Sequence, residues 1–278
     1  PSITIDRMIK RIIGKIIAST AGKNKKLGLA VEIPASEHRI NRQLLEPKAV
    51  EVVRTLKNAG FDAYIVGGAV RDLVLGVRPK DFDVATNATP EQVKALFRRA
   101  FIIGRRFRIV HVVFGRGREH EVIEVSTFRA LLDNAQAEKV SGNEKTAKNA
   151  LIGMKHAIDE HGRVLRDNVW GSQQEDAARR DFTINAMYYD PERHIIVDYH
   201  HGFADCRRHI IQLIGDPATR YREDPVRILR AVRFAAKLEN LGFVIEKRTA
   251  APIAQSKDLL LEIPQSRMFD EALKLLQT

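Results

Sequence analysis

A pair of adjacent glycines, Gly67 and Gly68, lies between two segments whose apolar patterns predict different structures. Residues 62–66 form a short apolar run that predicts a strand, and residues 69–75 have the pattern of a helix. Glycine adopts positive φ angles readily, and the backbone N–H groups at a helix start favour an anion. A strand that runs through two glycines into a helix therefore predicts a turn suited to phosphate.

Two carboxylates, Asp81 and Asp83, follow within residues 81–85, which predict the next strand. Residues two apart on a strand point to the same face. Carboxylates on one face repel each other unless a cation lies between them, and oxygen ligands suit Mg²⁺. A glycine pair alone is usually a tight turn, and an Asp-x-Asp alone is usually a solvated loop. Because both occur here in this order, they predict a metal-dependent nucleotide site.

These residues and three later blocks resemble the class II nucleotidyltransferases, which include bacterial poly(A) polymerases and CCA-adding tRNA nucleotidyltransferases. The resemblance covers about residues 46–278 and implies an α/β head with a mixed β-sheet, followed by an all-helical neck. The five blocks that carry it are Ile65 to Gly76, Lys80 to Thr86, Ile123 to Arg129, Arg179 to Ala186 and Arg222 to Phe234.

Three regions are expected along the chain. Residues 1–45 predict a basic, flexible extension, residues 46–202 the catalytic head, and residues 203–278 the helical neck. Residues 130–162 are polar and of mixed charge, which predicts a mobile insertion within the head. Because members of the family usually continue into further helical regions, we expect the neck to be truncated.

Two helices have clear signals in the sequence, one in the head and one in the neck. Thr89 and Pro90 are an N-cap residue and a first-turn proline, so we expect a helix over residues 90–99. In the neck, one apolar helix face is predicted, formed by Leu229, Val232, Ala235 and Ala236.

The resemblance implies roles for the acidic residues. Asp81 and Asp83 would bind the catalytic metal ions, Mg²⁺ or Mn²⁺, which would lower the pKa of the primer 3′-hydroxyl and neutralise phosphoryl charge. Glu124, on a strand expected to neighbour them, either completes this set or is an ordinary surface residue. Asp181 is a candidate catalytic acid, or else it positions Arg180 through an ion pair.

Further residues are candidates for contacts with the nucleotide. Asp224 and Arg227 lie three apart on a predicted helix and so share a face, where a carboxylate and a guanidinium match the edge of a base. The family selects the incoming nucleotide at these positions. A solvated basic helix with internal ion pairs is the ordinary alternative for this segment. The candidates for contacts with phosphate, ribose or primer are Gly67, Gly68, Arg71, Arg180, Arg230 and Arg233.

The segment Gly104–Phe107, with His111 after it, resembles an element of bacterial poly(A) polymerases from which CCA-adding relatives usually depart. We therefore expect an adenylyltransferase that adds AMP from ATP to RNA 3′ ends and releases pyrophosphate, with Arg105 and Arg106 as RNA contacts. The alternatives are a CCA-adding enzyme and an RNA- or nucleotide-binding module that lacks turnover. Transfer to a small acceptor is disfavoured, because such relatives lack the arginine-containing blocks of the head and neck.

Composition agrees with this interpretation. The chain has 46 Lys and Arg against 35 Asp and Glu, and its net charge of +11 favours a polyanionic partner such as RNA. Its single cysteine, Cys206, cannot form an intramolecular disulfide, so we expect a reducing, cytoplasmic location. No apolar run approaches the ~20 residues that span a bilayer, so no membrane partner is expected.

Overall fold

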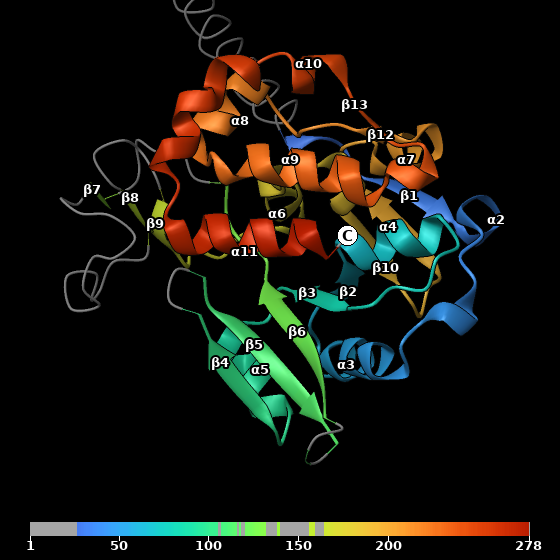
Figure 1. Ribbon diagram of the computed structural model, residues 1–278. Coiled ribbons are helices and arrows are strands. Elements are labelled where there is room, and N and C mark those ends of the chain that lie inside the picture. The colour runs from blue at the N-terminus through green and yellow to red at the C-terminus, as the bar shows by residue number, and fades with distance from the viewer. Residues whose placement is uncertain are drawn as a thin grey trace, which may run out of the picture.

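The computed structural model describes residues 27–104, 107–115, 117, 120–131, 138–139, 156–158 and 164–277. Its centre is an eight-stranded sheet in the order β1-β11-β10-β2-β3-β6-β5-β4 (Figure 1). The strands β3 and β6 are parallel and the other neighbouring pairs are antiparallel, which confirms the predicted mixed sheet. The strands are β1 Val31–Pro34, β2 Ala63–Val66, β3 Asp83–Thr86, β4 Ala100–Ile103, β5 Ile109–Phe114, β6 Glu121–Thr127, β10 Met187–Asp190 and β11 Ile195–Asp198.

One face of the sheet, called the inner face here, is covered by α3 (Pro47–Asn58), α4 (Gly68–Val74) and α5 (Pro90–Leu96). Alternate strand residues point into this core because successive side chains of a strand face opposite ways. The predicted N-cap of α5 is confirmed, since the Thr89 hydroxyl accepts from the Gln92 backbone N–H in a capping box. The helix ends at Leu96, three residues earlier than predicted, and β4 begins at Ala100.

The opposite, outer face is covered only over part of its width by α6 (Gln173–Arg179), through Ala177. Beneath α6 lies a second apolar cluster on strands β2, β3, β10 and β11. Tyr188 is central to it and makes edge-to-face contacts with Tyr64 and Phe128, with ring centroids 6.1 and 6.0 Å apart. The cluster comprises Val66, Ala85, Phe128, Ala177, Tyr188 and Val197.

The C-terminal part of the chain is mainly helical, as predicted, and its helices α9 and α11 run side by side (Figure 1). The all-helical prediction omitted a short two-stranded parallel sheet in this region. It forms where β12 (Ile210–Ile211) pairs with β13 (Val244–Ile245), and the residues of both strands are β-branched. The helical elements are η5 Thr183–Asn185, α7 Gly202–Arg208, α8 Pro217–Glu223, α9 Val226–Lys237, η6 Glu239–Leu241, α10 Lys247–Ala250, η7 Ala254–Glu262 and α11 Gln265–Leu276.

Two predicted boundaries differ from the structure. Residues 31–34 were expected in a flexible extension, but they form β1 and pair with β11, so they belong to the sheet of the head. They are followed by α2 (Ala35–His38) and η1 (Arg42–Leu44). The described parts of the predicted insertion form strands β7 (Glu138–Lys139) and β8 (His156–Ile158), which join β9 (Val164–Asp167) in a separate sheet.

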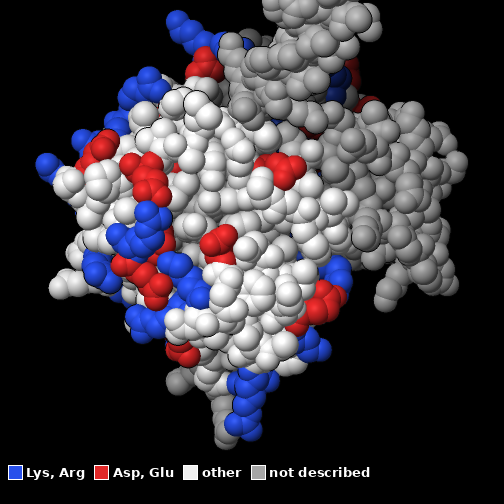
Figure 2. All heavy atoms as spheres, turned by 180° about the vertical axis from the view of Figure 1, so that it is seen from behind, with Lys and Arg blue, Asp and Glu red and all other residues white. Residues whose placement is uncertain are grey.

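The predicted apolar face of α9 is also wrong. Val232 is 45% exposed, whereas Ala231 and Phe234 are buried in the main core and Arg233 is buried where it pairs with Glu271 of α11. On the face of the molecule turned away from Figure 1, basic and acidic side chains lie next to one another around a wide uncharged area (Figure 2). The described part of that face therefore offers a polyanion no continuous basic patch. None of the described helices has the length and apolar character needed to cross a bilayer.

Candidate active site

The glycine turn lies between a carboxylate and a guanidinium. Gly67 ends the β2 segment and caps α4 with φ 74° and ψ −142°, a backbone conformation that side-chain-bearing residues rarely adopt. A Cβ added at Gly67 would lie 3.8 Å from Asp83 Oδ2 and 3.8 Å from Arg180 Nη1. The turn therefore places its backbone close to both charged groups.

Asp83 is the first residue of β3 and lies opposite Glu124 of the parallel strand β6. The predicted strand over 81–85 begins two residues late, so Asp81 lies in the preceding loop. The predicted alternation still holds, because Phe82 is buried while Asp81 and Asp83 are exposed on either side of it. The prediction that Glu124 lies on the neighbouring strand is confirmed.

The electrostatics around Asp83 favour a cation. Loss of hydration, and next the negative charge of Glu124, raise the pKa of Asp83 to about 6, although Arg180 opposes the shift. On its other side, Glu124 faces His111, whose Nε2 atom lies 3.5 Å from Glu124 Oε2. Within the described ranges, no cluster of three or more acidic, histidine or cysteine side chains has the arrangement of a metal site. The negative charge of Asp81 adds a smaller contribution to the raised pKa of Asp83, so the structure brings the three predicted carboxylates within electrostatic reach of one another.

Arg180, at the C-terminal end of α6, is fixed by three acceptors beside this pair. Its Nη2 donates to Asp176 Oδ2 at 3.3 Å, its Nε to the Tyr188 hydroxyl at 3.2 Å, and its Nη1 to the Asn185 carbonyl at 3.3 Å. Burial alone would lower its pKa, but Tyr188 and Asp176 hold the pKa of Arg180 above its usual value. A permanent cation is therefore held next to the glycine turn.

Arg71 was predicted to contact the nucleotide, but its side chain points into the protein interior. It is only 2% exposed, and its Nε and Nη2 donate to Asp72 Oδ1 at 2.9 and 2.7 Å. Its Nη1 donates to Asn185 Oδ1 at 2.9 Å. Because a buried guanidinium must satisfy its donors within the protein, Arg71 ties α4 to η5 beneath Gly68. It packs against Gly68 from the protein interior and stays buried.

Asp181 joins the head to α9. Its Oδ2 accepts from Arg230 Nε at 2.6 Å and its Oδ1 from the Phe182 backbone N–H at 2.7 Å. Burial opposes ionisation, but Arg230 and this N–H hold the pKa of Asp181 below its usual value. An ion pair between Asp181 and Arg180 was one of the two predicted roles. The carboxylate of Asp181 pairs with Arg230 instead.

Two of the predicted phosphate-binding arginines are paired with α11. Glu271 is buried, and its Oε2 accepts from Arg233 Nε at 2.6 Å while its Oε1 lies 3.4 Å from Arg230 Nη1. The Arg233 guanidinium also lies over the Phe234 ring, 4.5 Å from its centroid. Glu271 and these arginines therefore form a buried network that joins α9 to α11.

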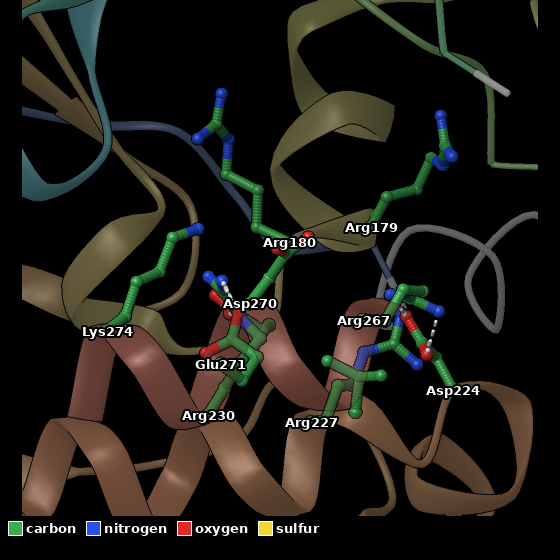
Figure 3. A pocket seen from close by; sticks show the side chains of 11 residues that line it. Arg179, Arg180, Asp224, Arg227, Arg230, Arg267, Asp270, Glu271 and Lys274 are labelled. Atoms are coloured by element: carbon green, nitrogen blue, oxygen red, sulfur yellow. Dashed lines mark hydrogen bonds and ion pairs between the residues drawn. The ribbon is translucent and has the colours of Figure 1, made fainter. Parts of the chain in front are cut away.

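Asp224 and Arg227 line a cavity of about 450 Å³ between α9, α11 and the end of α6. They do not share a helix as predicted, because Asp224 precedes Pro225 and is extended, with φ −151° and ψ 94°. Figure 3 shows the Asp224 carboxylate facing Arg267 of α11, whose Nη1 and Nη2 lie 3.0 and 3.1 Å from its two oxygens. The cavity is lined by Arg179, Arg180, Asp181, Asp224, Val226, Arg227, Arg230, Arg267, Asp270, Glu271 and Lys274.

Sequence reasoning missed Arg267, Glu271 and Asp176. Their spacing carried a weak signal, since Arg267 and Glu271 are four apart on one helix and Asp176 is four before Arg180. The predicted RNA contacts Arg105 and Arg106 lie outside the described residues.

Comparison with known proteins places the chain in a family. The family described as poly A polymerase head domain matches residues 63–212, and the one described as probable RNA and SrmB-binding site of polymerase A matches residues 242–278. Poly(A) polymerase I of Salmonella typhi is 48% identical over 245 residues, covering 88% of this chain and 48% of that protein. The CCA-adding enzyme of Bacillus licheniformis is 37% identical over 230 residues, covering 83% of this chain and 50% of that enzyme.

A solved structure supports the same assignment. The Bacillus stearothermophilus CCA-adding enzyme, crystallised in complex with CTP, matches with a TM-score of 0.64 and 35% identity, covering 84% of this chain and 49% of that chain. The chain spans about half the length of the curated relatives it matches. Since the head-domain match extends over more than half of the sequence, the chain belongs to the poly(A) polymerase head-domain family.

Proposed function

We propose that the chain is the catalytic part of a poly(A) polymerase, which transfers AMP from ATP to RNA 3′ ends and releases pyrophosphate. The observation that carries this proposal is the Asp83 and Glu124 pair, held beside the glycine turn and Arg180. Carboxylates, a glycine turn and a fixed cation are the groups that nucleotidyl transfer needs at one place.

The Asp83 and Glu124 carboxylates fit a divalent cation such as Mg²⁺ or Mn²⁺. They lie side by side, and the partial loss of hydration of Asp83 and the negative charge of Glu124, which raise the pKa of Asp83 to about 6, are effects that a bound cation would offset. When bound, the metal ion would neutralise phosphoryl charge and acidify the attacking 3′-hydroxyl. Asp81, in the exposed loop before β3, is the nearest further acid in the sequence.

The phosphates of ATP are proposed to lie over the glycine turn. Gly67 lacks a side chain, so the backbone can approach the phosphates closely, and Arg180 supplies positive charge from the side. Asp176 and Tyr188 hold that guanidinium in one orientation, which lowers the cost of ordering it when the nucleotide binds.

The base is proposed to enter the cavity that Asp224 and Arg227 line. Arg267 engages both oxygens of Asp224, but an ionised carboxylate has about four acceptor positions, so Asp224 can still accept from a base. Arg227 uses Nη1 to donate to the Arg220 carbonyl at 2.8 Å, which fixes the orientation of its guanidinium. Fixed donors and acceptors can select a base without a template strand.

The CCA-adding activity is the second candidate, because the structure matches a CCA-adding enzyme with a TM-score of 0.64. The poly(A) assignment is favoured by higher identity, 48% against 37%, and by the segment Gly104–Phe107 with His111. A binding module without turnover is disfavoured, because Asp83, Glu124 and Arg180 are all retained at one place.

The test is extension of a short 5′-labelled RNA with Mg²⁺ and either ATP or CTP alone. We expect long ladders with ATP and little product with CTP. The variant Asp83→Ala should abolish extension and leave RNA affinity nearly unchanged, whereas Asp258→Ala, which changes an exposed aspartate of η7, should behave as wild type. Extension with CTP but not ATP would contradict the assignment, and full activity of Asp83→Ala would contradict the proposed site.

A further inference from the structure

The outer face of strands β4, β5 and β6 carries apolar side chains that α6 does not cover. The helices that pack on these strands, α3 and α5, lie on the inner face. On the outer face, Phe101 is 54% exposed, Val122 is 39% exposed and Ile103 is 36% exposed. Exposed apolar groups gathered on one face are typical of a contact surface. By strand alternation, the outer-face residues are Phe101, Ile103, Ile109, His111, Val113, Val122, Glu124 and Ser126.

This face is continuous with the candidate active site. The sheet register places Asp83 opposite Glu124, Glu124 opposite His111, and His111 opposite Phe101. Residues opposite each other on neighbouring strands point to the same face. The four side chains therefore form one row that runs from the candidate metal site to the exposed ring of Phe101. Because neighbouring strands are about 4.8 Å apart, the row is about 14 Å long.

The in-line geometry of the transfer reaction determines from which side of Asp83 the primer approaches. The attacking oxygen and the leaving pyrophosphate lie roughly in line on opposite sides of the reacting phosphorus. The glycine turn lies on the β2 side of Asp83, and β6 lies on its other side. If the triphosphate lies over the turn, the primer must approach from the side of β6, β5 and β4, along the row.

We propose that the outer face of β4, β5 and β6 binds the 3′-terminal nucleotides of the RNA primer, with Phe101 as a stacking surface for a base. The proposal rests on the nucleotidyl transfer proposed above. An exposed aromatic ring stacks on any base, which suits a polymerase that extends RNA ends without reading a template. Stacked nucleotides rise about 3.4 Å each, so a row of about 14 Å spans about four steps and Phe101 would meet the fourth or fifth base from the 3′ end.

The test uses an RNA primer of eight adenylates in which one residue at a time is replaced by the fluorescent base 2-aminopurine. Binding is measured without ATP, so no turnover is needed. The variants are Phe101→Ala, which removes the ring, and Phe101→Trp, which keeps a stacking surface. Leu96→Ala is the matched control, because Leu96 is 36% exposed on α5, which covers the inner face.

We expect Phe101→Ala to weaken primer binding about tenfold and to abolish the quenching of 2-aminopurine at the fourth or fifth position from the 3′ end. Phe101→Trp should retain both properties, and Leu96→Ala should match wild type. Unchanged affinity and quenching in Phe101→Ala would overturn the proposal. A change in self-association without any change in primer affinity would also overturn it, because the face would then contact protein. Extension by wild type with ATP, measured in parallel, separates failure of this inference from failure of the proposed function.

Discussion

Replacing Asp83 by Asn should make the metal-free protein more stable while abolishing its activity. The pKa of Asp83 rises from an ordinary value of 3.8 to about 6. Because each pKa unit corresponds to about 1.4 kcal/mol, the shift sets an upper limit of about 3 kcal/mol on the cost of the ionised side chain. Asp83 is exposed, so solvent screening reduces the expected cost to about 1 kcal/mol.

The sign follows from the direction of the shift. A carboxyl group whose pKa is higher in the folded state destabilises the fold once it ionises. The cost is therefore absent below about pH 4, grows between about pH 4 and pH 6, and stays constant at higher pH. At pH 7.5 the Asp83→Asn variant should unfold about 2–4 °C above wild type, and at pH 4 the two should be equal.

The measurement is thermal unfolding in EDTA at both pH values, with Asp258→Asn as the control for loss of one exposed aspartate. Addition of Mg²⁺ should stabilise wild type more than the Asp83→Asn variant, since the ion would relieve the repulsion between Asp83 and Glu124. A variant that is less stable than wild type at pH 7.5 would refute the reasoning. A stability difference that does not change between pH 4 and pH 7.5 would refute it as well.

Three further substitutions test other parts of the site. Gly67→Ala should cost about 1–3 kcal/mol in urea unfolding, because Gly67 has φ 74°, and it should lower kcat by at least about tenfold by displacing the turn. Arg267→Ala should raise the KM for ATP about fivefold, because Asp224 loses the guanidinium that orients it. The affinity for tripolyphosphate, which has no base, should not change. A parallel loss of tripolyphosphate binding would contradict a role of Arg267 in positioning Asp224 for the base. Asp181→Asn should destabilise the protein by about 2 kcal/mol at pH 7, because Asp181 has a lowered pKa beside Arg230. That stability is present above the unfolded-state pKa and lost as the pH falls, so the difference should shrink towards pH 3; a difference independent of pH would contradict the ion pair.

Local sequence patterns predicted the parts of the fold that depend on neighbouring residues. The Thr89 cap, the glycine turn and the alternation around Asp83 all depend on residues a few positions apart. The pairing of β1 with β11 was missed, because it joins residues 31–34 to residues about 160 positions later. The strand is short and mostly exposed, so it carries little periodic signal.

Side-chain orientation and ion-pair partners were the least predictable features of the site. Arg71 lies three residues after Gly68 on α4, yet its side chain is directed towards Asn185 in the interior, because the fold packs η5 against α4. Asp224 pairs with Arg267, which lies 43 positions later and meets it only through the packing of α11 on α9. Sequence identifies such charged residues as candidates, but the pairing of charges across helices is set by tertiary packing.

The most direct test of the central claim is extension of a tRNA that lacks its terminal CCA, with Mg²⁺ and both ATP and CTP present, followed by sequencing of the products. A poly(A) polymerase should give runs of adenylate of increasing length with almost no cytidylate. Addition of C, C and A followed by arrest would contradict the claim and identify a CCA-adding enzyme.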